Sequence, residues 1–172
     1  GAKNAAVAII PAAILSDSEV TICNVPEISD IDSLEEILKF LNIDVKRATE
    51  TVLINPSHMK NKEIPERIAK KLRASYYFMG ALLTKYKHVE MYFPGGCNIG
   101  ARPINIHLEG FKKLGATVIE DNNRYIIKAD KLVGTNIYLD VASVGAKINL
   151  MLAAVKAEGT TTLENAAREP EI

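Results

Sequence analysis

The sequence predicts an α/β fold of repeated units, each with the order helix, strand, helix, strand, strand. Along its 172 residues, segments with apolar residues at helical spacing alternate with short runs rich in β-branched residues. Two pairs of segments are also alike: 21–25 (TICNV) with 162–166 (TLENA), and 41–45 (LNIDV) with 114–118 (LGATV). The second pair has about half the separation of the first, which indicates a repeat of roughly 70 residues. Such units pack their helices together and place their sheets outside.

The composition fits one domain or one large piece of a domain. Hydrophobic residues make up 48% of the chain, which is enough for a core and excludes a disordered protein. The 21 Lys and Arg residues balance the 21 Asp and Glu residues, so no basic field for nucleic acid covers the whole chain. No apolar run reaches roughly 18 residues, so we expect no membrane partner. The two cysteines favour reduced thiols in a cytoplasmic protein over a disulfide framework.

The first unit covers about residues 1–50. Its first helix should be buried on nearly all sides, and Asp30 or Asp32 should cap its second helix. Cys23 falls in an apolar strand and is expected in the core. A polar loop rich in turn residues follows at 55–66. The expected elements are a helix at 5–15, a strand at 20–25, a helix ending near 41, and strands at 45 and 52–54.

The second unit covers about residues 51–134. Its first helix should bury one face, and its second helix should end at Gly115, a typical C-terminal cap. The run Asp-Asn-Asn at 121–123 predicts a turn between two strands. The expected elements are a helix at 68–85, a strand at 89–93, a helix at 103–114, and strands at 116–119 and 124–128.

The third unit, about residues 135–172, is predicted to be truncated. It shows a strand at 136–141, a helix at 145–156 and a strand at 160–165, without a second helix and final strands. A repeated unit cannot bury its apolar faces alone, so we expect the missing half-unit to leave apolar surface exposed.

The stretch FPGGCNIGARP at 93–103 is the strongest functional signal. Its three glycines and leading proline exclude regular structure around Cys97, and Arg102 stands before a proline that can open a helix. A thiol near a guanidinium and a helix N-terminus can act as an acid or as a thiolate nucleophile. An inert buried cysteine is the alternative, and the flanking glycines argue for exposure.

The same stretch carries a family resemblance. The run PGGCNIGARP resembles the UDP-N-acetylglucosamine 1-carboxyvinyltransferase family. Further stretches carry the same resemblance: GAKNA at 1–5, LRAS at 72–75, SVG at 143–145, and EGTT at 158–161 followed by ENAAREPE. The resemblance implies the enolpyruvyl transferase fold, with βαβαββ-type units, helices inside and sheets outside. It also implies two similar domains of three units each. This chain would be most of the cysteine-bearing domain, with the second domain absent.

The resemblance further implies an activity. Enzymes of this family transfer the enolpyruvyl group of phosphoenolpyruvate to the 3-hydroxyl of UDP-N-acetylglucosamine and release phosphate. This is the first committed step of peptidoglycan synthesis, on which cell wall biogenesis, cell shape and cell division depend. A bacterial cytoplasmic enzyme with no metal or organic cofactor is implied, and the isolated chain is expected to lack turnover because one wall of the cleft is missing.

Site residues also follow from the resemblance. Cys97 would donate a proton to the enol ether, form a covalent adduct with it, and be alkylated by fosfomycin. The phosphoenolpyruvate site would comprise Lys3, Asn4, Arg73 and Arg102. The UDP-N-acetylglucosamine site would comprise Arg73, Arg102, Pro103, Ile104, Asn105, Ile106, Ser143 and Val144. The chain departs from the common family pattern at Asn105, where Asp is frequent, and at Val141, where Lys is frequent.

Simpler readings of these residues remain. A single Arg is more often part of an ion pair on a helix face, and a single Lys is more often solvated. His107 is expected to be a satisfied helix residue, and His58 and His88 lack metal-ligand spacing. Glu169 and Glu171 are expected to be structural or to face another domain. Alternative functions are a 5-enolpyruvylshikimate-3-phosphate synthase of the same fold, or a non-catalytic module that binds sugar nucleotides.

Overall fold

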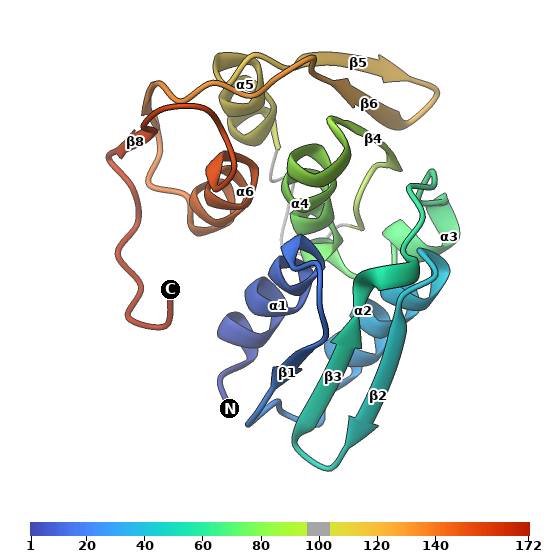
Figure 1. Ribbon diagram of the computed structural model, residues 1–172. Helices are drawn as coiled ribbons and strands as arrows, with labels where there is room; N and C mark the ends of the chain where they lie inside the picture. Colours follow the sequence, from blue (N-terminus) through green and yellow to red (C-terminus); the bar gives the residue numbers. More distant parts are fainter. Residues whose placement is uncertain (96–103) are drawn as a thin grey trace.

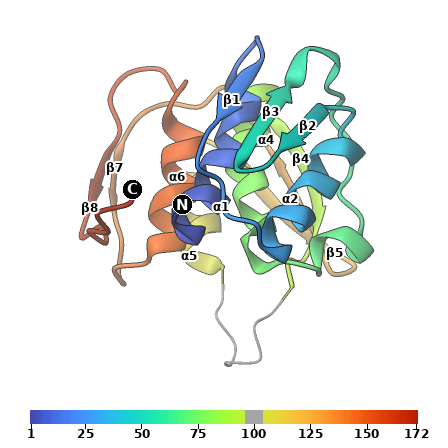
Figure 2. The same cartoon turned by 90° about the horizontal axis from the view of Figure 1, so that it is seen from below.

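The computed structural model describes residues 1–95 and 104–172. The predicted site residues Cys97, Arg102 and Pro103 lie outside this part of the chain. Three helices occupy the middle of the molecule: α1 (Lys3–Ala12), α4 (Tyr77–Tyr86) and α6 (Val144–Ala154). The strands described form sheets outside these helices (Figures 1 and 2), as predicted. The three helices begin at residues 3, 77 and 144, which agrees with the predicted repeat.

The first unit has the predicted order of elements. After α1 and the short 3-10 helix η1 (Ala13–Leu15), the chain forms β1 (Val20–Ile22), α2 (Ser29–Phe40), β2 (Asp44–Ala48) and β3 (Thr51–Asn55). The three strands form an antiparallel sheet in the order β1-β3-β2, with Ile22 opposite Val52. β3 therefore belongs to the sheet of the first unit, which extends to Asn55. Val52 and Ile54 are fully buried and face the helices, as a period of two requires.

The second unit repeats this arrangement. After α4 come β4 (His88–Tyr92), α5 (Asn105–Lys113), β5 (Thr117–Asp121) and β6 (Arg124–Lys128), and the sheet has the order β4-β6-β5. The predicted turn is present: Asn122 and Asn123 have φ values of 48° and 64°, which a two-residue hairpin turn between twisted strands requires. Gly115, with φ of 105°, ends α5 as predicted.

The third unit contains α6 between two short strands. β7 (Asn136–Tyr138) and β8 (Thr162–Glu164) pair in parallel, as expected for strands joined through a helix. The remaining short elements lie between the first and second units. They are η2 (Pro56–His58), α3 (Glu66–Ala69) and η3 (Arg73–Tyr76).

The prediction of one helix at 68–85 is wrong for the first half of this range. The chain instead forms α3, leaves helical geometry at Leu72 with φ −142° and ψ 128°, and resumes as η3 and α4. The buried Ser75 hydroxyl donates a hydrogen bond to the Ala69 carbonyl at 2.9 Å, which ties the two sides of the break together. A side chain that bonds to the backbone in this way competes with the helical ladder, and apolar spacing cannot reveal it.

Two smaller predictions in the first unit are also wrong. Neither Asp30 nor Asp32 caps α2, because the helix begins at Ser29 and both carboxylates instead form ion pairs, with Lys3 and Arg47. Cys23 is exposed rather than in the core. It follows the buried Ile22 directly, and alternate residues of an extended chain face opposite sides.

Helices α4 and α6 approach each other closely, and this contact forms the centre of the core. A Cβ atom on Gly80 would lie 2.3 Å from the backbone oxygen of Asn149, so this crossing requires glycine. One turn later, the buried Thr84 hydroxyl lies 2.7 Å from the carbonyl oxygens of Leu152 and Ala153. The contact fixes the N-terminal ends of both helices next to each other, where the candidate site is found.

An apolar groove of about 340 Å³ lies between α1 and α6. Large side chains that line it are exposed, notably Ile9 at 46%, Met151 at 47% and Val155 at 64%. Exposed apolar surface, which the sequence predicted, is therefore present along this groove. None of the helices in the described part of the chain has the length and hydropathy needed to cross a bilayer.

Candidate functional site

A cavity of about 390 Å³ opens where the N-terminal ends of the central helices meet. Its walls come from α1, from η3 and the start of α4, from α5, and from the start of α6. The residues that line it are Asn4, Val7, Arg73, Tyr76, Tyr77, His107, Ser143, Val144, Gly145 and Ile148. Four of them, Asn4, Arg73, Ser143 and Val144, are site residues that the sequence predicted.

The first turn of α1 places its two predicted residues differently. Asn4 lines the cavity, and its side-chain amide lies 3.4 Å from a carboxylate oxygen of Glu171. Lys3 lies outside the cavity lining, and its ammonium group pairs with Asp30 at 2.7 Å. The Lys3 side chain is 57% exposed, so the ion pair contributes little to stability and Lys3 can leave Asp30 to bind another anion at little cost.

Arg73 lines the cavity from the first position of η3, directly after the break that follows α3. Its guanidinium carbon lies 5.8 Å from the centre of the Tyr76 ring, within the range of a cation–π contact. A guanidinium in this position can bind a carboxylate or phosphate through two parallel hydrogen bonds.

The residues predicted to contact the nucleotide at the start of α5 differ in their exposure. Ile104 is buried in the core, whereas Asn105 is exposed at the first position of the helix and Ile106 is half-buried. None of the three is among the residues lining the cavity. The cavity residue from α5 is His107, which the sequence did not predict at the site.

Ser143 and Gly145 shape the wall at the start of α6. The Ser143 hydroxyl accepts a hydrogen bond from the Ala146 backbone N–H at 3.2 Å and so caps the helix. A Cβ atom on Gly145 would lie 2.4 Å from the Tyr76 hydroxyl, so this position keeps room for the tyrosine. Val144 is 38% exposed beside them, and Val141 is 60% exposed.

A group of uncharged residues, which we call the neutral cluster, extends from the cavity wall into the core. It consists of Tyr76, Gly80, His107 and Asn149. Asn149 is fully buried, and its side chain bonds to the Gly80 N–H at 2.9 Å, the Tyr76 carbonyl at 3.0 Å and Nδ1 of His107 at 3.1 Å. The His107 ring meets the Tyr76 ring edge to face, with centres 4.8 Å apart.

Burial lowers the pKa of His107 from 6.5 to about 4, and the nearby positive charge of Arg73 adds to this effect. His107 is therefore neutral near pH 7. Burial also holds the pKa of the Tyr77 phenol above its usual range, so this residue keeps its proton as well. Arg73 thus faces the cavity beside uncharged rings. No local pattern in the sequence could have identified His107 as a cavity residue, because Arg73, whose charge acts on it, lies 34 positions earlier in the chain.

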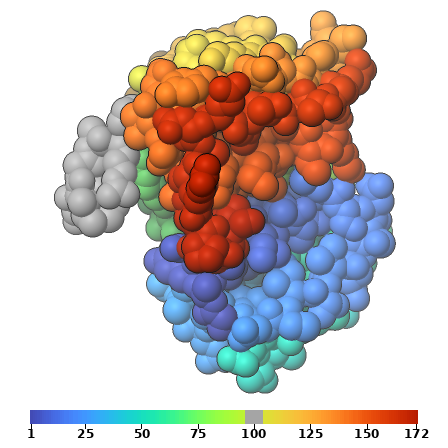
Figure 3. Space-filling view, turned by 90° about the vertical axis from the view of Figure 1, so that its left-hand side faces the viewer, coloured from blue at the N-terminus to red at the C-terminus, as the bar shows by residue number. Residues whose placement is uncertain are grey.

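The C-terminal segment folds back beside the site. Lys147, which is 8% exposed on α6, donates hydrogen bonds to the Ala167 carbonyl at 2.9 Å and to the Glu169 carboxylate. The hydrogen bond from Lys147 is the main cause that lowers the pKa of Glu169. The segment then reaches Asn4 through Glu171, and Figure 3 shows its residues (red) against the start of the chain (dark blue).

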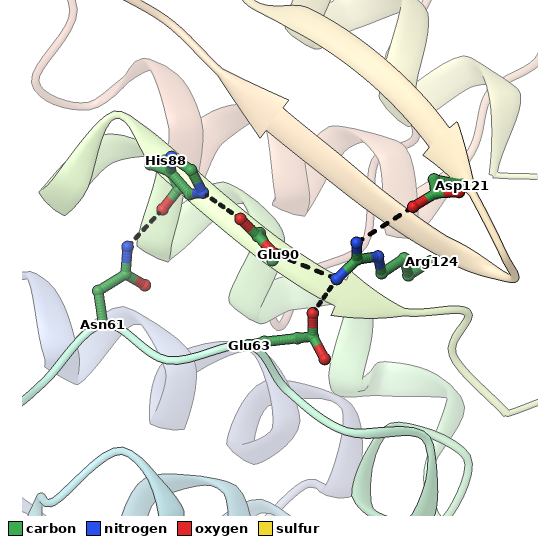
Figure 4. Close-up of polar contacts among 6 residues, drawn as sticks. All are labelled: Asn61, Glu63, His88, Glu90, Asp121 and Arg124. Carbon is green, nitrogen blue, oxygen red and sulfur yellow. Dashed lines mark hydrogen bonds and ion pairs between the residues drawn. The ribbon is translucent and has the colours of Figure 1, made fainter.

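A second polar group, which we call the charged cluster, lies on the sheet of the second unit (Figure 4). Arg124 contacts the carboxylates of Glu63, of Glu90 at 3.4 Å and of Asp121 at 3.1 Å. The remaining members are His88, 2.8 Å from Glu90, and Asn61, which donates to the His88 carbonyl. Because each charge already has a partner and the cluster lies away from the cavity, we interpret it as structural. Within residues 1–95 and 104–172, no three His, Cys, Asp or Glu side chains are grouped to hold a metal ion.

The chain matches several curated proteins along its whole length. It is 54% identical over 172 residues to UDP-N-acetylglucosamine 1-carboxyvinyltransferase 2 of Oceanobacillus iheyensis, and 52% identical to the protein of the same name from Bacillus subtilis. In both comparisons the match covers 100% of this chain and 40% of the relative. The chain therefore spans about two fifths of the length of these relatives, and the resemblance seen in the sequence is confirmed.

Solved structures show the same fold at low identity. The enolpyruvyl transferase NikO from Streptomyces tendae superposes with a TM-score of 0.85 at 22% identity, over 100% of this chain and 41% of that chain. EPSP synthase from Acinetobacter baumannii superposes with a TM-score of 0.77 at 16% identity, over 99% and 40%. The family model for EPSP synthase matches residues 1–172. The chain belongs to the EPSP synthase (3-phosphoshikimate 1-carboxyvinyltransferase) family, and its whole length is similar to UDP-N-acetylglucosamine 1-carboxyvinyltransferases.

Proposed function

We propose that the protein containing this chain transfers the enolpyruvyl group of phosphoenolpyruvate to the 3-hydroxyl of UDP-N-acetylglucosamine and releases phosphate. The observation that carries this proposal is the cavity, which gathers Asn4, Arg73 and Ser143 from distant parts of the sequence. The family resemblance assigns these same residues to the two substrates. Relatives at 54% and 52% identity are named for this activity.

The chemistry requires an acid and an anion site. Cys97 delivers a proton to C3 of phosphoenolpyruvate, and the carbon at C2, now electron-poor, bonds to the oxygen of the sugar hydroxyl, whose proton restores the thiol. The phosphate then leaves C2 and takes up the proton lost from C3, which restores the double bond. Arg73 and Arg102 hold the negative charges of the substrates, with Lys3 and Asn4 beside phosphoenolpyruvate. The stretch from Pro103 to Ile106 and the pair Ser143 and Val144 contact the nucleotide.

The chain supplies one wall of the site. We assign it to most of the cysteine-bearing domain, with the predicted units at about 1–50, 51–134 and 135–172, except that the first unit extends to Asn55 because β3 belongs to its sheet. The exposed groove between α1 and α6 supports an incomplete third unit. The remaining length of the protein provides the second domain and the opposite wall. Such an enzyme works in the cytoplasm on the peptidoglycan pathway, and the 172-residue chain alone has no appreciable turnover.

Fosfomycin tests the proposal in the full-length protein. We expect one covalent adduct, mapped to Cys97 by peptide mass spectrometry, that forms at a rate changed by UDP-N-acetylglucosamine. A Cys97→Ser variant should show no adduct. A Cys23→Ser variant is the matched control, because it removes a thiol that the structure shows to be exposed, and it should react like the unmodified protein.

Two outcomes would contradict the proposal. Equal labelling of Cys23 and Cys97, with no response to the sugar nucleotide, would indicate an ordinary thiol. Product formation with shikimate 3-phosphate but not with UDP-N-acetylglucosamine would assign the protein to the other activity of this fold.

A further inference from the structure

The contacts of Asn149 determine how its side-chain amide is oriented. Its Oδ1 lies 2.9 Å from the backbone nitrogen of Gly80. A backbone N–H can only donate, so the atom facing it has to be the amide oxygen and not the nitrogen. The assignment of oxygen and nitrogen, which is often ambiguous in asparagine, is thus fixed by the hydrogen-bond network.

The orientation of Asn149 then determines the hydrogen on His107. The amide nitrogen Nδ2 faces the Tyr76 carbonyl at 3.0 Å and Nδ1 of His107 at 3.1 Å. Because an amide NH₂ group only donates, Nδ1 has to accept and cannot carry hydrogen. A neutral imidazole with a bare Nδ1 carries its hydrogen on Nε2.

The surroundings of His107 favour this neutral form. The side chain is 5% exposed, and the other charged or titratable groups lining the cavity with it, among the residues described, are Arg73, Tyr76 and Tyr77. Arg73 repels a second positive charge, and burial of the ring disfavours any charge on it. The edge-to-face contact with Tyr76 holds the plane of the ring.

We propose that Asn149 is a positioning residue, which holds His107 as the neutral Nε2–H tautomer so that the cavity offers an uncharged hydrogen-bond donor in addition to the guanidinium of Arg73. Such a donor suits an acceptor oxygen of a bound substrate, either of phosphoenolpyruvate or of the sugar nucleotide. It stabilises that oxygen without a second cation in the same cavity. The identity of the substrates rests on the proposed function, whereas the tautomer does not.

Nitrogen-15 NMR of the full-length protein with labelled histidine tests this directly. A protonated ring nitrogen and a bare one have clearly different shifts, and a His107→Gln variant assigns the signals. We expect a bare Nδ1 and a protonated Nε2 for His107 without any substrate. Asn149→Asp replaces the donor by an acceptor of the same shape, so it should move the hydrogen to Nδ1 and raise the pKa of the ring. Asn165→Asp makes the same change at an exposed site and should leave His107 unaltered.

Binding measurements give the functional arm of the test. If the tautomer serves ligand binding, Asn149→Asp weakens binding of at least one substrate by ~10-fold, as expected for the loss of one hydrogen bond, while Asn165→Asp does not. Separate titrations with phosphoenolpyruvate and with UDP-N-acetylglucosamine show which substrate the donor serves.

The outcomes separate this inference from the proposed function. A protonated Nδ1 in the unmodified protein, or rapid exchange between tautomers, would overturn the positioning role, even in an active enzyme. So would unchanged binding of both substrates to a folded Asn149→Asp protein that shows the shifted hydrogen. An enzyme with the expected tautomer but no enolpyruvyl transfer would overturn the proposed function instead. The spectrum of the unmodified protein decides the tautomer even if Asn149→Asp does not fold.

Discussion

The neutral cluster and the charged cluster both join segments that are distant in the sequence, but they do so with different groups. The neutral cluster joins α4, α5 and α6 in the interior through amide, imidazole and backbone groups. The charged cluster joins the segment before α3 to the three strands β4, β5 and β6 through Arg124 and carboxylates at the surface. Both have nearly all of their hydrogen-bonding groups paired, and they differ mainly in access to water.

The difference follows from desolvation. An uncharged polar group in the interior is tolerated when it is hydrogen-bonded, but its partner becomes costly once the bond is lost. A charge at the surface can always return to water, so an ion pair there contributes little. We therefore expect large effects from changes in the neutral cluster and small effects from changes in the charged cluster.

Asn149→Ala should produce the largest effect. It removes three hydrogen bonds at once and leaves the Gly80 N–H and the Tyr76 carbonyl to find other partners in the core. We expect a loss of ~4 kcal/mol in the free energy of unfolding, measured by urea denaturation. Asn165→Ala removes a single bond to the Leu139 carbonyl from an exposed residue, and it serves as the control. Similar losses in the two variants would show that burial does not distinguish these sites.

The pH dependence of stability should show an intermediate effect in the neutral cluster. Because the pKa of His107 is lowered to about 4, His107 is protonated in the unfolded chain but neutral in the folded chain between pH 6.5 and 4. The stability from a neutral His107 is present above pH 6.5 and is lost as the pH falls from 6.5 toward 4, by up to ~3 kcal/mol. Urea denaturation at a series of pH values measures this, and His107→Gln should reduce the slope in that range. An unchanged slope would contradict the assignment.

Arg124→Gln should produce the smallest effect, although Arg124 contacts three carboxylates. We expect a minor shift in the urea midpoint at low salt and no measurable shift at high salt, because the pairs are screened. The hydrogen bond with His88 is the main cause that lowers the pKa of Glu90. The contribution of ionised Glu90 to the free energy of unfolding is therefore fully present above the ordinary carboxyl pKa, and it is lost as the pH falls through the lowered pKa. A loss as large as that of Asn149→Ala would invalidate the contrast between the clusters.

The sequence by itself determined the α/β class, the repeat, and most elements. These features depend on local patterns: apolar spacing, the glycine that ends α5, and the Asn-rich turn between β5 and β6. The short motifs were also sufficient to indicate the family and to name Asn4, Arg73 and Ser143, which the fold brings to one cavity.

Only the tertiary structure decided how the cavity is built. The break before η3 depends on a hydrogen bond from Ser75, and the role of His107 depends on Asn149, which lies 42 residues further along the chain. Cys23 was misassigned because β1 ends before it and the chain turns its side chain outward. Periodicity reports which face of an element is apolar, whereas the partner of a polar group is set by contacts between elements, and these exist only once the helices have packed.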